Sequence, residues 1–253
     1  MTLHNKVFVI TGGAQGLGFA MAQAFAAKGT KVALVDINEE RLLTAKRHCA
    51  DLGVHCCGYV ANVAKEAEVE QLFEDVLNDF GALDGLINNA GIIRDGLLVK
   101  ARDGQISQRL SLEEWQAVID INLTGVFLCG REAATKMIEI NRPGIIINIS
   151  SISKAGHIGQ SNYSAAKAGV AALTVTWSKE LARFGIRCAG IAPGFIGTEM
   201  VNGMKPQALA KMTGMIPEGR LGEPAEIAQT AIYIAENNFI NGRIIEIDGG
   251  MRL

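Results

Sequence analysis

The chain has 253 residues, of which 49% are hydrophobic and 20% are charged. This balance excludes a disordered chain and provides ample material for a buried core. The formal net charge of -2 offers no basic field for nucleic acid or for an anionic membrane surface, and no apolar run is long enough to span a bilayer.

Short apolar runs alternate with longer amphipathic runs along the chain. The strand-like runs are residues 7–11, 32–36, 54–60, 85–88, 144–150, 186–192 and 243–248, and helical patterns lie between them at roughly 16–28, 38–52, 64–80, 111–140, 162–184 and 224–237. Several strand runs are apolar throughout, as expected for strands covered on both faces. The alternation predicts an α/β fold with a doubly wound, parallel, seven-stranded sheet (a Rossmann fold) in one domain, 1–253.

A glycine cluster follows the first strand and opens the first helix. It reads Thr11-Gly12-Gly13-Ala14-Gln15-Gly16-Leu17-Gly18. Glycines at this place allow a tight turn and let backbone N–H groups approach a pyrophosphate. Between a strand and a helix, the cluster indicates a dinucleotide site rather than a simple turn.

Asp36 closes the second strand, 18 residues after Gly18. A carboxylate at this spacing accepts hydrogen bonds from the ribose hydroxyls and repels a 2′-phosphate. Gln15 and Ile37 supply no cation for such a phosphate, so we predict NAD rather than NADP. The alternative role for Asp36 is to cap the helix that follows.

The five cysteines show no metal-ligand or disulfide spacing. They are Cys49, Cys56, Cys57, Cys129 and Cys188, and no CxxC pair occurs among them. We therefore expect reduced thiols, no metal site and, because a strand-like run begins soon after Met1, no signal peptide. These features predict a cytoplasmic protein.

Tyr163 and Lys167 are spaced by four residues in a helical pattern, which places them on one helix face. Ser150 ends the fifth strand, thirteen residues before Tyr163. A neighbouring ammonium and an oxidised nicotinamide would lower the pKa of the phenol, so that Tyr163 exchanges a proton with a substrate oxygen. Ser150 is expected to hydrogen-bond the same oxygen. His157 lies between them and is expected either to contact substrate or to face solvent.

Residues 193–223 contain three prolines and six glycines, and they follow the carboxyl end of a strand, where ligands bind in such sheets. Four methionines also lie here: Met200, Met204, Met212 and Met215. We predict a mobile substrate lid around residues 194–222, with a short helix at 206–213, in preference to a surface excursion with some core contacts.

Taken together, these motifs resemble the short-chain dehydrogenase/reductase family over essentially the whole chain, and within it most closely the 3-oxoacyl-[acyl-carrier-protein] reductases. Thr11 to Gly18 matches the family's Thr-Gly-x-x-x-Gly-x-Gly, and Asn88 to Gly91 matches its Asn-Asn-Ala-Gly. The resemblance implies a catalytic set of Asn122, Ser150, Tyr163 and Lys167, in which Asn122 holds a water-linked proton relay to the lysine. It implies the following cofactor-binding set: Gly12, Gln15, Gly16, Leu17, Gly18, Asp36, Asn62, Val63, Asn89, Ala90, Gly91, Tyr163, Lys167, Pro193, Gly194, Ile196 and Thr198.

Two segments depart from the family pattern. Asn62-Val63 stands where the family has Asp-Val, so weaker charge effects are expected near the adenine. Residues 92–112 are longer and more polar than in typical acyl-carrier reductases and border the active-site mouth in the family. Substrate inference from the resemblance is therefore weaker at this segment.

The resemblance implies an NAD(H)-dependent 3-oxoacyl-thioester reductase, although most of those reductases prefer NADPH. The alternative is an NAD-dependent dehydrogenase of another secondary alcohol (hydroxyacyl-CoA, sugar, polyol or steroid), and a remote one is a non-catalytic dinucleotide-binding sensor. Arg142 and Arg183 lie where the acyl-carrier reductases have basic residues that dock the acidic carrier protein; an ordinary solvated charge is the alternative for each. The last strand and tail, residues 244–253, resemble the family's subunit contact and imply a homotetramer.

Overall fold

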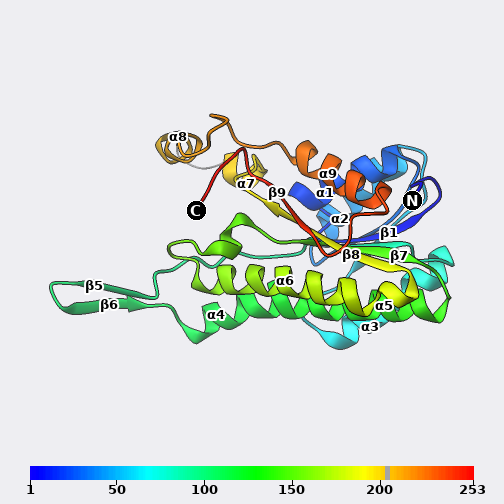
Figure 1. The fold of residues 1–253 in the computed structure, drawn as a ribbon, viewed down its shortest axis with the longest axis horizontal. Coiled ribbons are helices and arrows are strands. Elements are labelled where there is room, and N and C mark those ends of the chain that lie inside the picture. The colour runs from blue at the N-terminus through cyan, green and yellow to red at the C-terminus, as the bar shows by residue number, and fades with distance from the viewer. Residues whose placement is uncertain (203–205) are drawn as a thin grey trace.

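A seven-stranded parallel sheet forms the middle layer of the computed structural model, which describes residues 1–202 and 206–253 (Figure 1). The strand order is β3-β2-β1-β4-β7-β8-β9. The strands are β1 (Val7–Thr11), β2 (Lys31–Asp36), β3 (Cys56–Val60), β4 (Gly85–Asn88), β7 (Gly144–Ile149), β8 (Ile186–Pro193) and β9 (Ile244–Ile247). The predicted doubly wound α/β fold is confirmed, with strand ends that differ from the expected ones by at most two residues.

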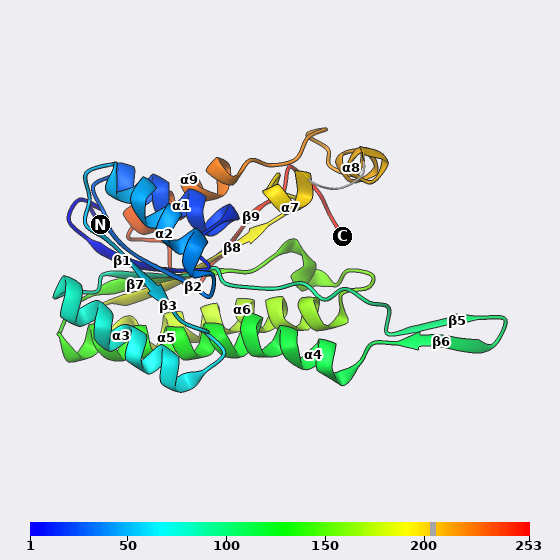
Figure 2. The same ribbon diagram turned by 180° about the vertical axis from the view of Figure 1, so that it is seen from behind.

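Helices cover both faces of the sheet (Figure 2). One face carries α1 (Gly16–Ala27), α2 (Glu39–Ala50) and α9 (Pro224–Glu236), and the other carries α3 (Glu66–Phe80), α4 (Leu112–Ile119), α5 (Gly125–Glu139) and α6 (Ser161–Glu180). Short turns of 3₁₀-helix lie at Ile152–Ala155 and Ala182–Phe184, and α7 (Glu199–Asn202) and α8 (Pro206–Thr213) follow β8. None of the helices that the structure describes is long and apolar enough to cross a membrane.

The continuous apolar character of the strands follows from this layering. In β1, Phe8 and Ile10 belong to the core under α1 and α9, whereas Val7 and Val9 belong to the core under α3 and α5. Because successive side chains of a strand point to opposite faces, both sets must be apolar when both faces are covered. All four of these side chains are buried.

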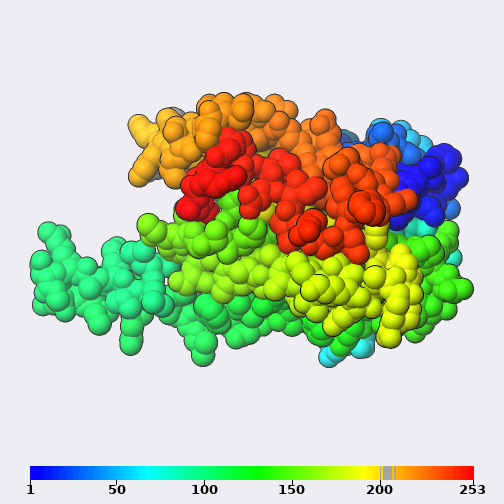
Figure 3. All heavy atoms as spheres, in the orientation of Figure 1, coloured from blue at the N-terminus to red at the C-terminus, as the bar shows by residue number. Residues whose placement is uncertain are grey.

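An unpredicted antiparallel hairpin interrupts this pattern between β4 and α4. It consists of β5 (Val99–Arg102) and β6 (Gln105–Arg109), and it projects beyond the body of the molecule (Figures 1 and 3). The turn is Asp103-Gly104, and both residues have positive φ, 52° and 76°. Asp-Gly is favoured in such two-residue turns, so the signal for the hairpin was present in the sequence.

The predicted helix 111–140 is also interrupted. A π-helical turn, Asp120–Thr124, lies between α4 and α5. One wider turn of this kind does not break the helix axis, but it changes which side chains face inward, and such turns occur frequently at functional sites. Here it contains Asn122, which is fully buried.

Candidate active site

A cleft of about 730 Å³ lies at the carboxyl edge of the strands β1 to β4. Eleven of the predicted cofactor residues line it: Gly12, Gln15, Gly16, Leu17, Asp36, Asn62, Val63, Asn89, Ala90, Gly91 and Thr198. Residues that sequence reasoning missed also line it: Val35, Ile37, Arg41, Ala61, Ile92, Ile121 and Glu199. The carboxyl edge of a parallel sheet is where α/β proteins bind dinucleotides, so the position agrees with the prediction.

The glycine cluster prepares the amino end of α1 for an anion. Gly12 and Gly16 have φ values of 61° and 53°, which other residues rarely adopt. Gln15 precedes the helix without a side-chain cap, and within residues 16–27, all described, the first turn contains no acidic side chain. The first N–H groups of the helix are therefore available to a pyrophosphate.

Gly18 has a different role from the predicted cofactor contact. A Cβ atom at this position would lie 2.1 Å from the carbonyl oxygen of Gly12 and 2.6 Å from Nδ2 of Asn89. Asn89 in turn donates from Nδ2 to the carbonyls of Thr11 and Gly12, at 3.0 and 3.1 Å. Gly18 thus permits close packing of α1 against the loop rather than lining the cleft.

Asp36 lies at the end of β2 and faces the cleft, as predicted. Its carboxylate accepts hydrogen bonds from the backbone N–H groups of Ala14 (3.3 Å) and Asn38 (3.1 Å). The cap of α2 is Asn38, whose side chain accepts from the N–H of Arg41 at 2.9 Å. The capping alternative for Asp36 is therefore wrong. Arg41, which also lines the cleft, adds a cation that was not expected.

Of the four residues predicted to border the nicotinamide, only Thr198 lines the cleft. Gly194 packs against the loop after β9, since a Cβ there would lie 2.8 Å from Cα of Asp248, and its N–H donates to Ile247. Ile196 is buried in the core that also contains residues of α9. Pro193, Gly194 and Ile196 position Thr198, which does line the cleft, instead of lining it themselves.

Ser151, rather than Ser150, lies against the phenol of Tyr163. The Ser151 hydroxyl forms a hydrogen bond with Tyr163, whereas the Ser150 hydroxyl donates to the backbone carbonyl of Lys167 at 2.9 Å. Ser150 directly follows β7 and faces α6, whereas Ser151 caps the 3₁₀-helix Ile152–Ala155. Spacing along the chain gave no means of choosing between two adjacent serines.

Tyr163 and Lys167 lie together on α6, as predicted. The Lys167 ammonium lies over the Tyr163 ring, 5.6 Å from its centre, and donates to the carbonyl of Ile149 at 2.8 Å. Burial is the largest influence on the phenol and raises the pKa of Tyr163; the bond with Ser151 lowers that pKa and the charge of Asp95 raises it. Burial also lowers the pKa of Lys167 to about 8. The protein groups thus act against the lowering that we predicted for the phenol, because loss of water outweighs the hydrogen bond with Ser151.

Asn122 is engaged with the segment after β4. Its Oδ1 accepts from the N–H of Ile92 at 2.8 Å, and its Nδ2 donates to the carbonyl of Ile92 at 2.9 Å. The side chain therefore fixes Ile92 beside the cleft. The predicted relay therefore requires the backbone of Asn122 rather than its side chain.

A polar network joins the start of the hairpin segment to α6. Gln160 donates from Nε2 to both oxygens of Asp95, at 3.2 and 3.0 Å, and its Oε1 lies 3.1 Å from Nδ1 of His157. Asn162, fully buried, donates to the carbonyls of Arg94 (2.9 Å) and Glu114 (3.1 Å). The two ends of the segment that carries the hairpin are thereby held at the first turn of the helix that bears Tyr163.

The predicted lid is partly anchored. Ile216 is buried with Ile152 and Met251, so the segment packs on the residue after Ser151 and on the carboxyl-terminal tail. Met212 is partly buried and Met215 is exposed. The predicted helix 206–213 is present as α8. Gly203 and Met204 lie outside the described residues, as does the side chain of Met200, and lid motion stays a prediction.

Arg142 and Arg183 lie at the other end of the sheet from the cleft. Arg142 forms an ion pair at 3.1 Å with Asp84, which directly precedes β4 at its amino end. Arg183 stacks on Phe184 in the turn before β8. Within one chain, neither guanidinium borders the mouth beside Tyr163.

Comparisons with known proteins agree with these features. A family model described as enoyl-(acyl carrier protein) reductase matches residues 12–252. The chain is 40% identical over 254 residues to the 3-oxoacyl-[acyl-carrier-protein] reductase FabG of Thermotoga maritima, covering 99% of both chains. It is 41% identical over 257 residues to the 3-oxoacyl-[acyl-carrier-protein] reductase of Synechocystis sp., covering 98% of both. It is also 37% identical over 250 residues to carbonyl reductase family member 4 of Xenopus laevis, covering 98% of this chain and 99% of that one.

Proposed function

Because the chain belongs to the short-chain dehydrogenase/reductase family, we propose that it reduces the ketone of a 3-oxoacyl thioester with NADH. The observation that carries the proposal is the pair of hydroxyls, Ser151 and Tyr163, held together beside a buried lysine at the mouth. Two hydroxyls on one oxygen position suit a carbonyl that gains negative charge as it is reduced. The names of the relatives from Thermotoga maritima and Synechocystis support the thioester as substrate.

The residues of the cleft fit a nicotinamide dinucleotide. The bare amino end of α1 and the Gly12–Gly16 turn would hold the pyrophosphate, and Asp36 would hold the adenosine ribose. When bound, the cofactor supplies the hydride. Thr198 and the segment after β8 would hold its nicotinamide end, with Asn62 and Val63 near the adenine.

Tyr163 delivers the proton to the ketone oxygen. Its raised pKa keeps the phenol protonated at neutral pH, as an acid must be, and Ser151 donates a hydrogen bond to the same oxygen. After transfer, the Lys167 ammonium stabilises the phenolate through the ring that it faces. Lys167 loses its own proton readily, since its pKa is about 8, and can therefore return one to Tyr163 through water held by the backbone of Asn122.

Asp36 supports NADH over NADPH, because its carboxylate is held at the position where a 2′-phosphate would approach. Arg41 lines the same part of the cleft and would attract that phosphate. We expect Asp36→Asn to raise the ratio of kcat/KM for NADPH to kcat/KM for NADH. Arg41→Ala should lower the same ratio. An unchanged ratio in Asp36→Asn would contradict the cofactor assignment.

The central experiment compares adjacent serines. Ser151→Ala should lower kcat for acetoacetyl thioester reduction by about 10²-fold or more, whereas Ser150→Ala should leave kcat nearly unchanged. Tyr163→Phe should abolish turnover while NADH still binds with an unchanged Kd. Equal losses in the two serine variants would remove Ser151 from its assigned role.

Substrate panels separate the alternatives. Reduction of a crotonyl thioester would favour the enoyl reduction named by the family model, and reduction of simple ketones would favour the activity named for the Xenopus laevis relative. Oxidation of polyols or steroids near neutral pH would favour a secondary-alcohol dehydrogenase. A cytoplasmic homotetramer that receives its thioester from an acyl carrier protein remains part of the proposal, and mass photometry tests the tetramer.

A further inference from the structure

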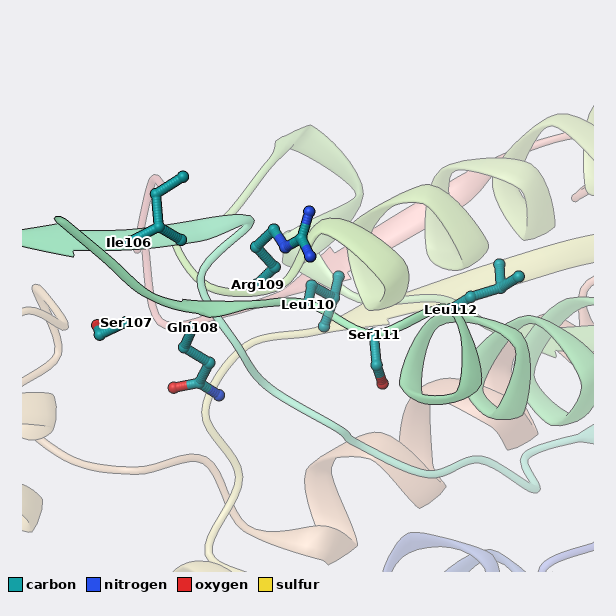
Figure 4. Close-up of a pocket in the computed structure, with 7 residues that line it drawn as sticks. All are labelled: Ile106, Ser107, Gln108, Arg109, Leu110, Ser111 and Leu112. Carbon is teal, nitrogen blue, oxygen red and sulfur yellow. The ribbon is translucent and has the colours of Figure 1, made fainter. Parts of the chain in front are cut away.

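The β5–β6 hairpin has one apolar and one cationic face. Strand pairing places Val99 opposite Arg109 and Ala101 opposite Ile106, whereas Lys100 lies opposite Gln108 and Arg102 opposite Gln105. The register skips Ser107, so Ile106 and Arg109 come to the same side of the strand (Figure 4). Directly paired residues share a face, so Val99, Ala101 and Ile106 form an apolar face with Arg109 at its end.

That apolar face has no cover from any described part of the chain. Val99 is 48% exposed and Ile106 is 64% exposed. Leu97 and Leu98 at the base are also exposed, by 46% and 69%. A two-stranded hairpin in water is marginally stable by itself, and clustered exposed apolar side chains indicate a binding surface. Residues 106–112 line an open concavity of about 910 Å³ that leads from β6 to α4 (Figure 4).

The charge of the hairpin is opposite to that of the chain. Residues 97–110 carry the cations Lys100, Arg102 and Arg109 and the anion Asp103, in a protein of net charge -2. An acidic partner is therefore repelled by the molecule as a whole and attracted at this projection. Two hairpins packed through their apolar faces would place the Arg109 guanidinium of each copy in the same interface, which disfavours a second copy.

The base of the hairpin is bonded to the residues that lead into α6, next to Tyr163. The N–H of Gly96 donates to the carbonyl of Gly159 at 2.8 Å, and Asn162 fixes the chain on both sides of the hairpin, one residue from Tyr163. From Gly96 to the turn is a span of ~20 Å at the usual rise of a strand. A partner seated on the hairpin can thus present a substrate to Tyr163 on an arm of similar length.

We propose that the β5–β6 hairpin docks the acidic protein that carries the acyl thioester; this rests on the proposed function. The polar tip, Arg102-Asp103-Gly104-Gln105, argues against insertion into a lipid surface, because the apolar residues lie toward the base. The apolar face argues against nucleic acid, which is held mainly through phosphates.

The test compares a carrier-bound substrate with the same acyl group on neutral N-acetylcysteamine. The charge reversal K100E/R102E/R109E and the apolar-face variant Ile106→Ser should each raise KM for acetoacetyl-acyl carrier protein, by about tenfold or more for the triple variant. Neither should change kcat/KM for the small thioester. The matched control K28E/K46E/R47E makes the same change of net charge on the exposed residue after α1 and on two exposed residues of α2, and it should behave as the wild type. KM for the carrier-bound substrate should also rise with salt in the wild type and in this control, but not in K100E/R102E/R109E.

Binding of acyl carrier protein without an acyl group, followed by fluorescence anisotropy, tests docking independently of turnover. Wild-type binding that K100E/R102E/R109E loses would support the proposal even if no thioester is reduced, in which case the proposed function fails instead. Absence of wild-type binding, equal losses on both substrates, or a triple variant that changes only the oligomeric mass would overturn the docking proposal.

Discussion

The phenol of Tyr163 is surrounded by groups of opposing effect. Burial and the charge of Asp95 raise its pKa, and the hydrogen bond with Ser151 lowers it. Asp95 is itself held by Gln160, and Lys167 lies across the ring. Together these groups favour the protonated phenol, which is the form that reduction requires.

Asp95→Asn keeps an oxygen that accepts from Gln160 but removes the negative charge. The pKa of Tyr163 should then fall, so that oxidation of a 3-hydroxyacyl thioester, which needs the phenolate, begins at lower pH. The measurement is kcat/KM for oxidation against pH. Asp103→Asn, which removes the same charge at the hairpin tip, serves as control and should leave the profile unchanged; matching shifts in both variants would mean that Asp95 has no local effect.

Lys167 is buried, no carboxylate of the described residues pairs with it, and its pKa of about 8 lies below its ordinary value of 10.5. At pH 7, burial of the charged amine therefore costs about 3 kcal/mol relative to the unfolded chain. Lys167→Met removes this cost and leaves the Ile149 carbonyl without its donor, which costs about 1 kcal/mol. We expect an inactive protein whose free energy of unfolding at pH 7 is about 2 kcal/mol higher.

The sign of the pH dependence tests that explanation. Between pH 8 and 10.5 the folded wild type has released a proton that the unfolded chain retains, so wild-type stability rises with pH and the advantage of Lys167→Met shrinks. Urea unfolding of both proteins at pH 7 and 9.5 measures how far this stability difference shrinks. Lys136→Met is the control: Lys136 pairs with Glu74 and Glu139, and its loss should destabilise the protein. A Lys167→Met variant less stable than wild type at pH 7 would refute the argument.

At the scale of elements, α1 packs on the glycine loop through Gly18. In a helix, alanine is favoured over glycine by about 1 kcal/mol, so propensity alone predicts that Gly18→Ala stabilises. The methyl group would instead lie 2.1 Å from a backbone oxygen, and we expect a loss of about 3 kcal/mol in the free energy of unfolding. Gly91→Ala, whose Cβ would lie 3.4 Å from Asn122, should cost far less. Denaturant midpoints of the two variants measure these losses of stability. Similar midpoints would contradict the packing argument.

The elements of the sheet were predictable because burial on both faces makes each strand apolar throughout, as in β7, where all six residues are buried.

The β5–β6 hairpin was harder to predict from the sequence. Its strands carry Lys100, Arg102, Gln105 and Gln108, and the skipped Ser107 breaks the alternation. Only the Asp103-Gly104 turn marked it. The π-helical turn left no such mark, because Asp120 to Thr124 continues the helical pattern on both sides.

At the scale of the whole molecule, the cleft was predictable from motifs that follow strand ends, such as Gly12–Gly16 and Asp36. Contacts between distant segments were not. Arg41 reaches the cleft from α2, and Ser151 meets Tyr163 because the loop after β7 turns toward α6. Such contacts depend on how the chain closes in space, which spacing along the sequence does not encode.

The hairpin is separable from the fold. All its strand residues are exposed, and Leu110 donates its N–H to Leu98 at 3.2 Å across the base. Replacing residues 99–109 by Asn-Gly should therefore change the free energy of unfolding by less than about 1 kcal/mol and preserve turnover of a small thioester. Asn162→Ala, which frees both ends of the segment, should lower both stability and kcat. Thermal unfolding and initial rates measure these effects, and a hairpin-deleted protein that fails to fold would show that the hairpin is structural.

The π-helical turn at Asp120–Thr124 sets how the helical segments on either side of it are rotated relative to each other. A variant that lacks one residue of this turn could form a regular helix, yet Asn122 would rotate away from Ile92 and one wall of the cleft would lose its support. The irregular turn therefore serves the cleft at the expense of a regular helix.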